Sequence, residues 1–265
     1  MNIINEELKK YLLTASEAAD QARSLLLSYY GRLAKIERKK MAGLVSEADK
    51  ESEKLIADHV LSKVPGSVFY GEEGVSDQSK AIPKDGLCWV VDPLDGTTNY
   101  IHQFHIFCIS IALLKDYQPV VGLIDVPMLD HRYVAVRDEG AYLNGKKISV
   151  SDTLTVSDSL IATGFFADDK PALKEQLRIF NKVVRRARGV RRSGAAAYDL
   201  CMGAQGIFDG FWEKNLKPWD TAAGHLLVEE AGGMVTTYDG EDFHATEKSI
   251  LASNKCIHNE LLKSF

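Results

Sequence analysis

The spacing of apolar and polar positions predicts two helices at the start of the chain. From about residue 6 to residue 30 apolar side chains recur every three or four positions, which indicates an amphipathic helix ended by Gly31. A second apolar stripe follows the sequence Ser46-Glu47-Ala48-Asp49, which fits a capping box at a helix start. The basic stretch between these helices, residues 32–43, has weak periodicity and is typical of a solvated charge run.

Short apolar runs dominate the next eighty residues and predict a sheet. Strands are expected at 68–70, 87–91, 107–114, 120–125 and 132–136. Their close succession favours an antiparallel meander. Pro93 lacks a backbone donor and is expected to end the ladder of the 87–91 strand. Asn144-Gly145 suits a type I′ turn and predicts a hairpin between residues 140 and 148.

Helices and strands alternate in the second half of the chain. Strands are expected at 160–163, 207–212, 234–237 and 250–253, and helices at 171–188, 195–204, 221–230 and the C-terminus. We therefore divide the chain into an N-terminal half, residues 1–150, and a C-terminal half, residues 151–265. No repeat or low-complexity linker separates them, so they are expected to share one layered α+β core.

Composition narrows the function classes. With 45% hydrophobic and 26% charged residues over 265 positions, the chain is typical of a globular protein. A net charge of −5 argues against nucleic-acid binding but permits small anionic substrates, because local cations can dominate a site. The four cysteines show no paired spacing, so buried reduced thiols are expected. No apolar run fits a signal peptide or a membrane span, which favours a cytoplasmic protein without membrane contact.

The most informative stretch is residues 89–100, where an apolar run leads directly into two carboxylates. Asp92 and Asp95 are separated by one turn and can converge on the same point. The carbonyl of Leu94 lies between them, so three hard oxygens would face one spot, which is the donor type that Mg²⁺ prefers. The segment therefore predicts a metal site at a strand end.

The residues that follow are suited to an anion. Gly96 allows close backbone approach, and residues 97–99 resemble a helix start with free N–H groups. An ordinary turn is the alternative, because Asp, Pro and Gly are common turn residues. Two further acidic elements, at residues 71–74 and 218–220, also follow apolar segments and favour the metal site over the turn.

Three motifs resemble the inositol monophosphatase family of magnesium-dependent, lithium-sensitive sugar phosphatases. They are Gly71-Glu72-Glu73, the run from Asp92 to Asn99, and Trp219-Asp220-x-Ala-x-Gly224 followed by Glu230-Ala231-Gly232-Gly233. They lie in the family's order across most of the chain. The resemblance implies a layered αβαβα sandwich, a homodimer, and Mg²⁺-dependent hydrolysis of a sugar or polyol phosphate.

The resemblance also implies a ligand set for two or three Mg²⁺ ions. The first ion is expected between Glu72, Asp92 and the Leu94 carbonyl, and the second between Asp92, Asp95 and Asp220. A third, weaker ion would depend on Glu72 and water. Helix capping is the alternative role for Asp220.

Catalytic and phosphate-binding roles follow from the same resemblance. Thr97, supported by Asp49, would orient the attacking water near Glu72, and the N–H groups of Gly96 and Thr97 would hold phosphate oxygens. The capping box remains the alternative for Asp49. The chain departs from the family's Leu-Val-Thr-x-x-Asp pattern in carrying Ser46 at the threonine position.

Substrate-binding residues are expected in the second half. Glu213 matches a family residue that binds ring hydroxyls, and Gly194 and Ala196 match a sugar-facing loop next to Asp220. A surface carboxylate after a strand is the alternative for Glu213. Thr98 stands where related 3′-nucleotidases and histidinol phosphatases tend to carry Lys, which favours inositol or a similar polyol phosphate.

Three alternatives stay open at this stage. Other phosphatases of the superfamily, acting on fructose 1,6-bisphosphate or NADP, share the motifs. A non-catalytic protein that binds RNA polymerase or the ribosome is a rival from a different class. Finally, a basic residue of the 32–43 stretch, Arg38 or Lys39, could reach the active site as a loop lysine does in the family.

Overall fold

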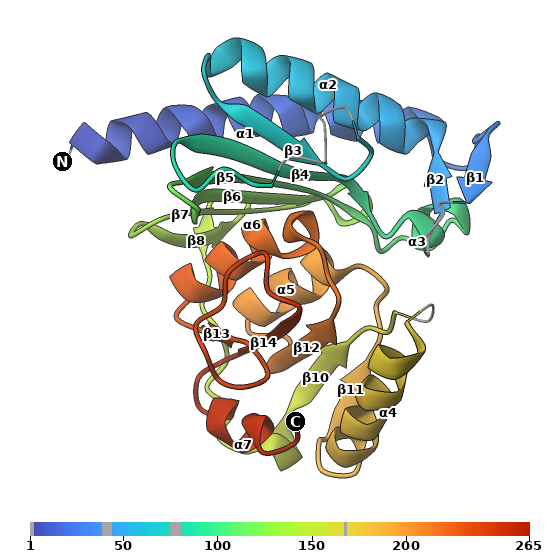
Figure 1. Ribbon diagram of the computed structural model, residues 1–265, viewed down its shortest axis with the longest axis vertical. Helices are drawn as coiled ribbons and strands as arrows, with labels where there is room; N and C mark the ends of the chain where they lie inside the picture. Colours follow the sequence, from blue (N-terminus) through green and yellow to red (C-terminus); the bar gives the residue numbers. More distant parts are fainter. Residues whose placement is uncertain (1–2, 39–43, 75–80, 167–168) are drawn as a thin grey trace.

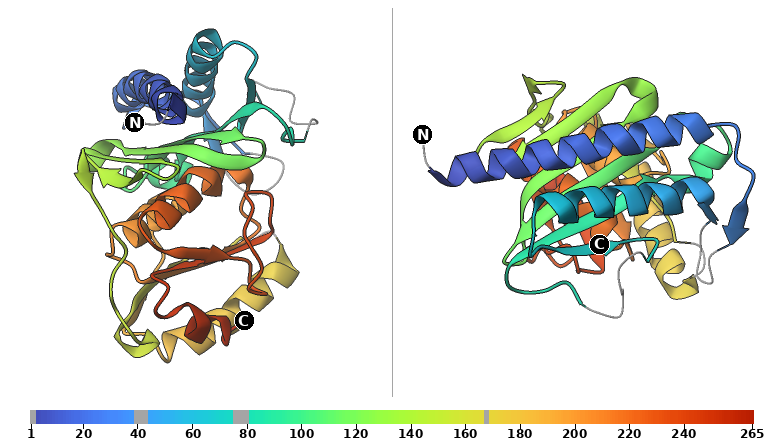
Figure 2. Two further views of the ribbon diagram at one scale, coloured as in Figure 1. Left: turned by 90° about the vertical axis from the view of Figure 1, so that its left-hand side faces the viewer. Right: turned by 90° about the horizontal axis from the view of Figure 1, so that it is seen from above.

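The computed structural model describes residues 3–38, 44–74, 81–166 and 169–265, and it stacks five layers (Figures 1 and 2). The outer layer holds α1 (Ile3–Tyr29) and α2 (Glu47–Lys63). Beneath them lies a seven-stranded sheet of β3 (Val68–Gly71), β4 (Leu87–Asp95), β5 (Cys108–Lys115), β6 (Gln118–Val126), β7 (His131–Val136), β8 (Gly140–Leu143) and β9 (Lys146–Lys147).

The remaining three layers come from the second half of the chain. The central layer is α5 (Ala196–Ala204) and α6 (Pro218–Glu230). Next is a five-stranded sheet of β10 (Leu160–Thr163), β11 (Gly189–Arg191), β12 (Gly210–Lys214), β13 (Met234–Thr236) and β14 (Ser249–Ser253). The last layer is α4 (Lys170–Val184) and α7 (His258–Leu262). The expected αβαβα sandwich is confirmed.

The two sheets differ in topology. The first runs in chain order from β3 to β9, antiparallel after the parallel β3–β4 pair, so the expected meander is confirmed. The second has the order β11-β10-β12-β14-β13, with β10 parallel to both β11 and β12. Asn144 and Gly145 both have positive φ between β8 and β9, as a type I′ turn requires.

The prediction that Pro93 ends the β4 ladder is wrong. Pairing with β5 is interrupted after Asp92↔Ser110 and resumes at Asp95↔Cys108, so β4 carries one extra residue there. Pro93 lies in this β-bulge, where the ladder does not need its missing N–H. The bulge keeps β4 in the sheet up to Asp95.

Two further boundaries differ from the sequence prediction. The strand expected at 207–212 is β12 and begins at Gly210, because residues 206–209 form a turn that leaves Ile207 half exposed. The 32–43 stretch, predicted to be a solvated charge run, contains β1 (Ile36–Arg38), which pairs antiparallel with β2 (Leu44–Ser46); Ile36 is 49% exposed and the Glu37 side chain 62%, so these residues are solvated as predicted. Short strands paired only with each other carry little apolar periodicity, which explains why the pattern missed them.

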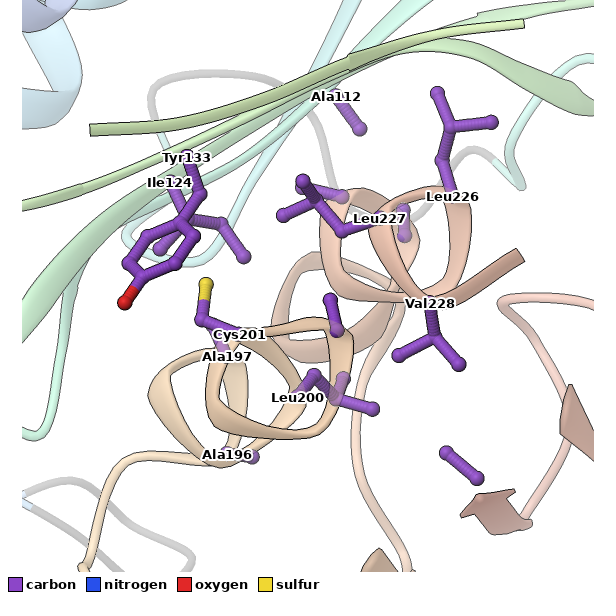
Figure 3. Packing of buried hydrophobic residues seen from close by; sticks show 14 of the residues in the cluster. Ala112, Ile124, Tyr133, Ala196, Ala197, Leu200, Cys201, Leu226, Leu227 and Val228 are labelled. Atoms are coloured by element: carbon purple, nitrogen blue, oxygen red, sulfur yellow. The ribbon is translucent and has the colours of Figure 1, made fainter. Parts of the chain in front are cut away.

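Three apolar clusters fill the spaces between the layers. One lies between α1, α2 and the first sheet, and one between the second sheet and α4 and α7. The largest surrounds α5 and α6 and draws on both sheets (Figure 3). The strands of the first sheet all precede residue 150 and those of the second all follow it. The apolar cluster around α5 and α6, however, contains residues from both halves of the chain. The division at residue 150 stays an interpretation.

Small residues let α6 lie close to its neighbours. A Cβ on Gly122 of β6 would come 2.9 Å from the Ala223 carbonyl of α6, and one on Gly224 would come 2.5 Å from a methyl of Leu200 on α5. These contacts place α6 directly against the first sheet and bring its N-terminus to the end of β4. Among the described residues no helix is both long and apolar enough to cross a bilayer.

Cysteine burial is as expected with one exception. Cys88, Cys108 and Cys201 are buried and free. Cys256 is free but exposed, so the expectation of a buried thiol is wrong there. It lies in the turn between β14 and α7, where the chain returns to the surface.

Candidate active site

The parallel pairing of β3 and β4 brings the first two acidic motifs together. Gly71 is the partner of Val91, so Glu72 and Asp92 occupy the next positions of adjacent strands. Asp92 is 2% exposed. Its pKa is raised well above the ordinary value, first by burial and then by the negative charges of Glu72, Asp95 and Asp220. Four carboxylates thus influence one another at the end of β4.

Asp95 joins the end of β4 to the central helix layer. Its Oδ2 accepts a hydrogen bond of 2.8 Å from the N–H of Ala197 in the first turn of α5, and Cys108 Sγ lies 3.6 Å away. Burial, opposed by these donors and reinforced by Glu72, raises the pKa of Asp95 to about 7. The contact ties the second half of the chain to the acidic cluster.

Asp220 reaches the cluster from the start of α6. The helix begins at Pro218 and not at Thr221 as expected, which makes Asp220 its third residue. Its Oδ2 accepts 2.6 Å from the N–H of the N-cap residue Lys217, so Asp220 supports the helix start from its third position and is not the cap itself, as the sequence alternative had it. Burial and then the charges of Glu72 and Asp95 raise the pKa of Asp220 well above its usual range.

Asp49 and Thr97 meet beside the cluster. Thr97 Oγ1 donates to Asp49 Oδ1 at 2.9 Å and lies 3.1 Å from the Leu94 carbonyl oxygen. Asp49 Oδ2 accepts from the backbone N–H of Ser46 at 2.8 Å and from its hydroxyl, completing the predicted capping box. The buried Asp49 carboxylate therefore completes the capping box with one oxygen and contacts Thr97 with the other.

Gly96 turns the chain between β4 and α3 (Thr97–Ile101). Its φ is +91°, a left-handed conformation that favours glycine. A Cβ there would come 3.1 Å from the Ile106 carbonyl and 3.3 Å from the Cβ of Ala195. Residue 96 therefore needs glycine for both its backbone conformation and the close packing around it.

A cavity of about 120 Å³ opens beside Asp95 and Asp220. Its lining includes every residue expected to contact the sugar: Gly194, Ala196, Glu213 and Asp220. Ala195 of the predicted sugar-facing loop lines it too, whereas sequence reasoning missed Thr163, Gly164, Arg192, Asp199 and Leu216. The pKa of Glu213 is raised well above its ordinary value by burial and by the charges of Asp199 and Asp220, which Arg192 opposes.

Asp199 is the most notable residue that the sequence motifs did not single out. It is 1% exposed, and its Oδ1 has no hydrogen-bond partner within the described parts of the chain. Burial raises the pKa of Asp199 to about 8, although hydrogen bonds from Ser193 and the charge of Arg192 act against this. An acidic residue in a helix of small and apolar residues was a signal that could have found it.

Two polar residues outside the motifs hold the site together. Ser110 of β5 donates to the Trp219 carbonyl at 3.0 Å and so fixes the residue that precedes Asp220. Asn99 donates to the carbonyls of Ile106 and Ser193 at 2.7 and 2.9 Å, which secures the loop before Gly194. The contacts of Ser110 with Trp219 and of Asn99 with Ser193 do not follow from sequence spacing, because they join residues 109 and 94 positions apart.

The donor set fits a hard divalent cation. The carboxylates of Asp92, Asp95 and Asp220 each use one oxygen to accept a backbone N–H, and their pKa values are raised by burial and then by neighbouring negative charges that a cation would neutralise. Over the ranges that the structure describes, no three acidic, histidine or cysteine side chains are yet gathered as a ready ligand set.

The structure does not describe the side chain of either basic residue that was a candidate for this site, Arg38 or Lys39. Lys39 lies outside the described residues. Arg38 ends β1, and its side chain is not described.

Comparison with known proteins gives consistent matches. The profile of the inositol monophosphatase family matches residues 7–265. A protein of Aquifex aeolicus named fructose-1,6-bisphosphatase/inositol-1-monophosphatase is 39% identical over 260 residues, covering 97% of this chain and 96% of that protein. A protein of Neisseria meningitidis serogroup B named putative Nus factor SuhB is 37% identical over 258 residues, covering 97% and 98%.

A solved structure agrees with these matches. The inositol monophosphatase of Anabaena sp. superposes with a TM-score of 0.83 at 36% identity, covering 97% of this chain and 96% of that one. Sequence profile, full-length relatives and fold thus lead to the same assignment. The chain belongs to the inositol monophosphatase family of phosphatases.

Proposed function

We propose that this protein hydrolyses a polyol phosphate monoester, most specifically myo-inositol monophosphate, with the help of Mg²⁺. The observation that carries this proposal is that Asp95 and Asp220 line one cavity together with Glu213, while the charges of Glu72 and Asp92 act on the same pair of carboxylates. Crowded carboxylates suit a metal-assisted reaction, and a further carboxylate suits a substrate rich in hydroxyls.

The residues in place would hold two ions in the arrangement that the family resemblance implies. Glu72, Asp92 and the Leu94 carbonyl would hold the first, and Asp92, Asp95 and Asp220 the second. Bound Mg²⁺ supplies a water of lowered pKa and neutralises charge on the phosphoryl and leaving-group oxygens. A third ion that depends on Glu72 stays a prediction.

The protein's own groups would orient the reactants. The Thr97 hydroxyl, which donates its proton to Asp49 at 2.9 Å, would accept a hydrogen bond from the attacking water near Glu72. The N–H groups of Gly96 and Thr97, exposed by the left-handed turn, would donate to phosphate oxygens.

On the leaving-group side, Glu213 would accept a hydrogen bond from a ring hydroxyl. Gly194, Ala196 and Asp220, which line the same cavity, would complete the sugar pocket.

A substrate panel tests the reaction and its substrate. Phosphate release is measured with inositol 1-phosphate, fructose 1,6-bisphosphate, NADP and an aryl phosphate, each with Mg²⁺, with Ca²⁺ and with excess chelator. We expect the highest kcat/KM for inositol 1-phosphate with Mg²⁺, and inhibition by Ca²⁺, which takes longer bonds and more ligands. Full activity in excess chelator would rule out a metal requirement. A higher kcat/KM for fructose 1,6-bisphosphate would make that compound the preferred substrate in place of inositol 1-phosphate.

A binding role in transcription is the second candidate, because the Neisseria relative is named a putative Nus factor. The retained acidic cluster argues against a purely structural role and is compatible with a second one. Binding of wild type and of a phosphatase-inactive variant to purified RNA polymerase tests it. Equal binding of the wild type and the inactive variant would show that polymerase binding does not need phosphatase activity. If neither protein binds, the transcription role is ruled out. The homodimer, the cytoplasmic location and the lack of nucleic-acid contact stay predictions.

A further inference from the structure

Gly164 lies against the carboxylate of Glu213 at the end of two parallel strands. Thr163 of β10 is the partner of Trp212 in β12, so Gly164 and Glu213 are the next residues along the two strands. An ideal Cβ built on Gly164 would come 2.1 Å and 2.2 Å from the two carboxylate oxygens of Glu213 and 2.3 Å from its Cδ. Residue 164 has no room for a side chain while Glu213 keeps this position.

The backbone of Gly164 is held in place from its other side. Its carbonyl accepts 3.2 Å from Gln176 Nε2 of α4, and the Tyr238 hydroxyl donates 2.7 Å to Gln176 Oε1. Thr163 Oγ1 donates 2.7 Å to the Trp212 carbonyl and joins the two strand ends. Gln176 is 1% exposed and Thr163 is fully buried, so these contacts are protected from water.

The surrounding charges make the position of the Glu213 carboxylate important. Asp199, Asp220 and the positively charged Arg192 line the same cavity as Glu213. A carboxylate that moves within this cavity changes its distance from all three groups and from any ring hydroxyl in the pocket. Glu213 is paired with Ile250 of β14, and the residue before it, Trp212, is paired on both sides, so such movement occurs by side-chain rotation.

We propose that Gly164 is a positioning residue for substrate discrimination: its missing side chain holds open the space in which the Glu213 carboxylate faces the sugar pocket. The inference rests on the proposed function of Glu213. A methyl group at residue 164 displaces the end of a flexible side chain and not a backbone, so the substitution changes substrate choice and leaves the fold intact.

The test compares Gly164→Ala with Gly203→Ala as the matched control. Gly203 lies within α5, and a Cβ built there would meet no atom within 4 Å. For each variant the ratio of kcat/KM for inositol 1-phosphate to kcat/KM for an aryl phosphate is measured, together with the melting temperature. We expect Gly164→Ala to lower the ratio at least about 10-fold, the scale of one hydrogen bond to a charged group. Gly203→Ala is expected to keep it.

A double substitution separates action through Glu213 from a general structural effect. In a Glu213→Ala background there is no carboxylate to displace, so adding Gly164→Ala should leave the ratio where Glu213→Ala alone puts it. A crystal structure of Gly164→Ala should show the Glu213 carboxylate moved by about 1 Å to restore van der Waals contact.

Several outcomes would overturn the inference. These are an unchanged ratio in Gly164→Ala, an equal further loss in the Glu213→Ala background, or an unmoved carboxylate. If wild type shows no preference for a polyol phosphate, the proposed function fails by itself. The crystal structure then decides the inference, and an unmoved Glu213 overturns it.

Discussion

At the scale of single residues, Asp220 combines two tasks in one carboxylate. One oxygen accepts the N–H of Lys217 and starts α6, and the side chain contributes charge to the acidic cluster. We expect Asp220→Asn to keep the first task, since its amide oxygen can still accept, and to lose the second. Turnover should fall at least about 10²-fold, the scale of one preorganised charge-stabilising contact.

Steady-state kinetics and a thermal melt of the metal-free protein check this prediction. The melt should change little, because removing one of several crowded carboxylates relieves repulsion. The ligand assignment is wrong if Asp220→Asn turns over at the wild-type rate at ordinary Mg²⁺ concentrations.

Glu213 bears on substrate identity and not on the reaction class. If it accepts a hydrogen bond from a ring hydroxyl, Glu213→Ala should lower kcat/KM for inositol 1-phosphate by roughly 1.5–3 kcal/mol more than for an aryl phosphate, which lacks that hydroxyl. Parallel kinetics on the two substrates measure the difference. An equal loss on both would assign Glu213 to the fold or to the metal site.

At the scale of elements, α1 is fastened to the first sheet through a buried carboxylate. Asp125 of β6 is fully buried and accepts from Arg132 Nε of β7 at 2.9 Å and from Arg23 Nη1 of α1 at 3.4 Å. Arg132→Met should reduce the free energy of unfolding by about 3 kcal/mol, because it leaves the buried Asp125 carboxylate with the longer contact to Arg23.

Urea denaturation with a matched control measures this effect. Arg188 forms an exposed pair with Asp158 at 2.8 Å, and Arg188→Met should cost no more than about 0.5 kcal/mol. Comparable losses in the two variants would mean that the pair with Asp125 is no stronger than a surface ion pair.

The contact between α7 and the second sheet predicts a pH dependence. His258 is buried between Thr236 Oγ1 and Ser253 Oγ, at 2.9 and 2.8 Å, and burial lowers its pKa to about 4. The unfolded chain takes up this proton near pH 6.5 and the native protein only near pH 4. The stabilising contribution of His258 is therefore complete above pH 6.5 and is lost as the pH falls toward 4.

Denaturant unfolding at pH 7 and pH 5 checks the sign. From pH 7 to pH 5 the free energy of unfolding of wild type should fall by about 2 kcal/mol more than that of His258→Asn. The comparison isolates His258, because the two proteins share all other titrating groups. An identical pH dependence in the two proteins would contradict the lowered pKa of His258.

At the scale of the whole molecule, the acidic cluster is built from both halves of the chain and should link metal binding to stability. Glu72, Asp92 and Asp95 come from the first half and Asp220 from the second. Mg²⁺ at 100 times its dissociation constant should raise the free energy of unfolding by about 2.7 kcal/mol, which corresponds to a rise of roughly 5–10 °C in melting temperature. Calorimetry with and without Mg²⁺ measures this shift.

The same variant used for kinetics supplies the control for stability. Asp220→Asn should show a smaller Mg²⁺-dependent shift than wild type. If Mg²⁺ at saturating concentration left the wild-type melting temperature unchanged, the cluster would not be a metal site in the folded protein.

The sequence by itself determined the layers and most of the acidic cluster. Apolar periods of two and of three to four residues identified the main strands and helices, because burial on one face imposes these periods. Acidic residues directly after apolar segments marked Glu72, Asp92, Asp95 and Asp220, because the ends of strands and the starts of helices are local features. Short strands such as β1 and the bulge at Pro93 were missed, since their pairing partners set them.

Only the tertiary structure decided the contacts between distant segments. Ser110 reaches Trp219, Asn99 reaches Ser193, and Gly164 makes room for Glu213. In each case the chain carries an ordinary serine, asparagine or glycine whose role depends on which strand or helix packs beside it. Packing between elements is a property of the whole core, and spacing along one segment contains no information about it.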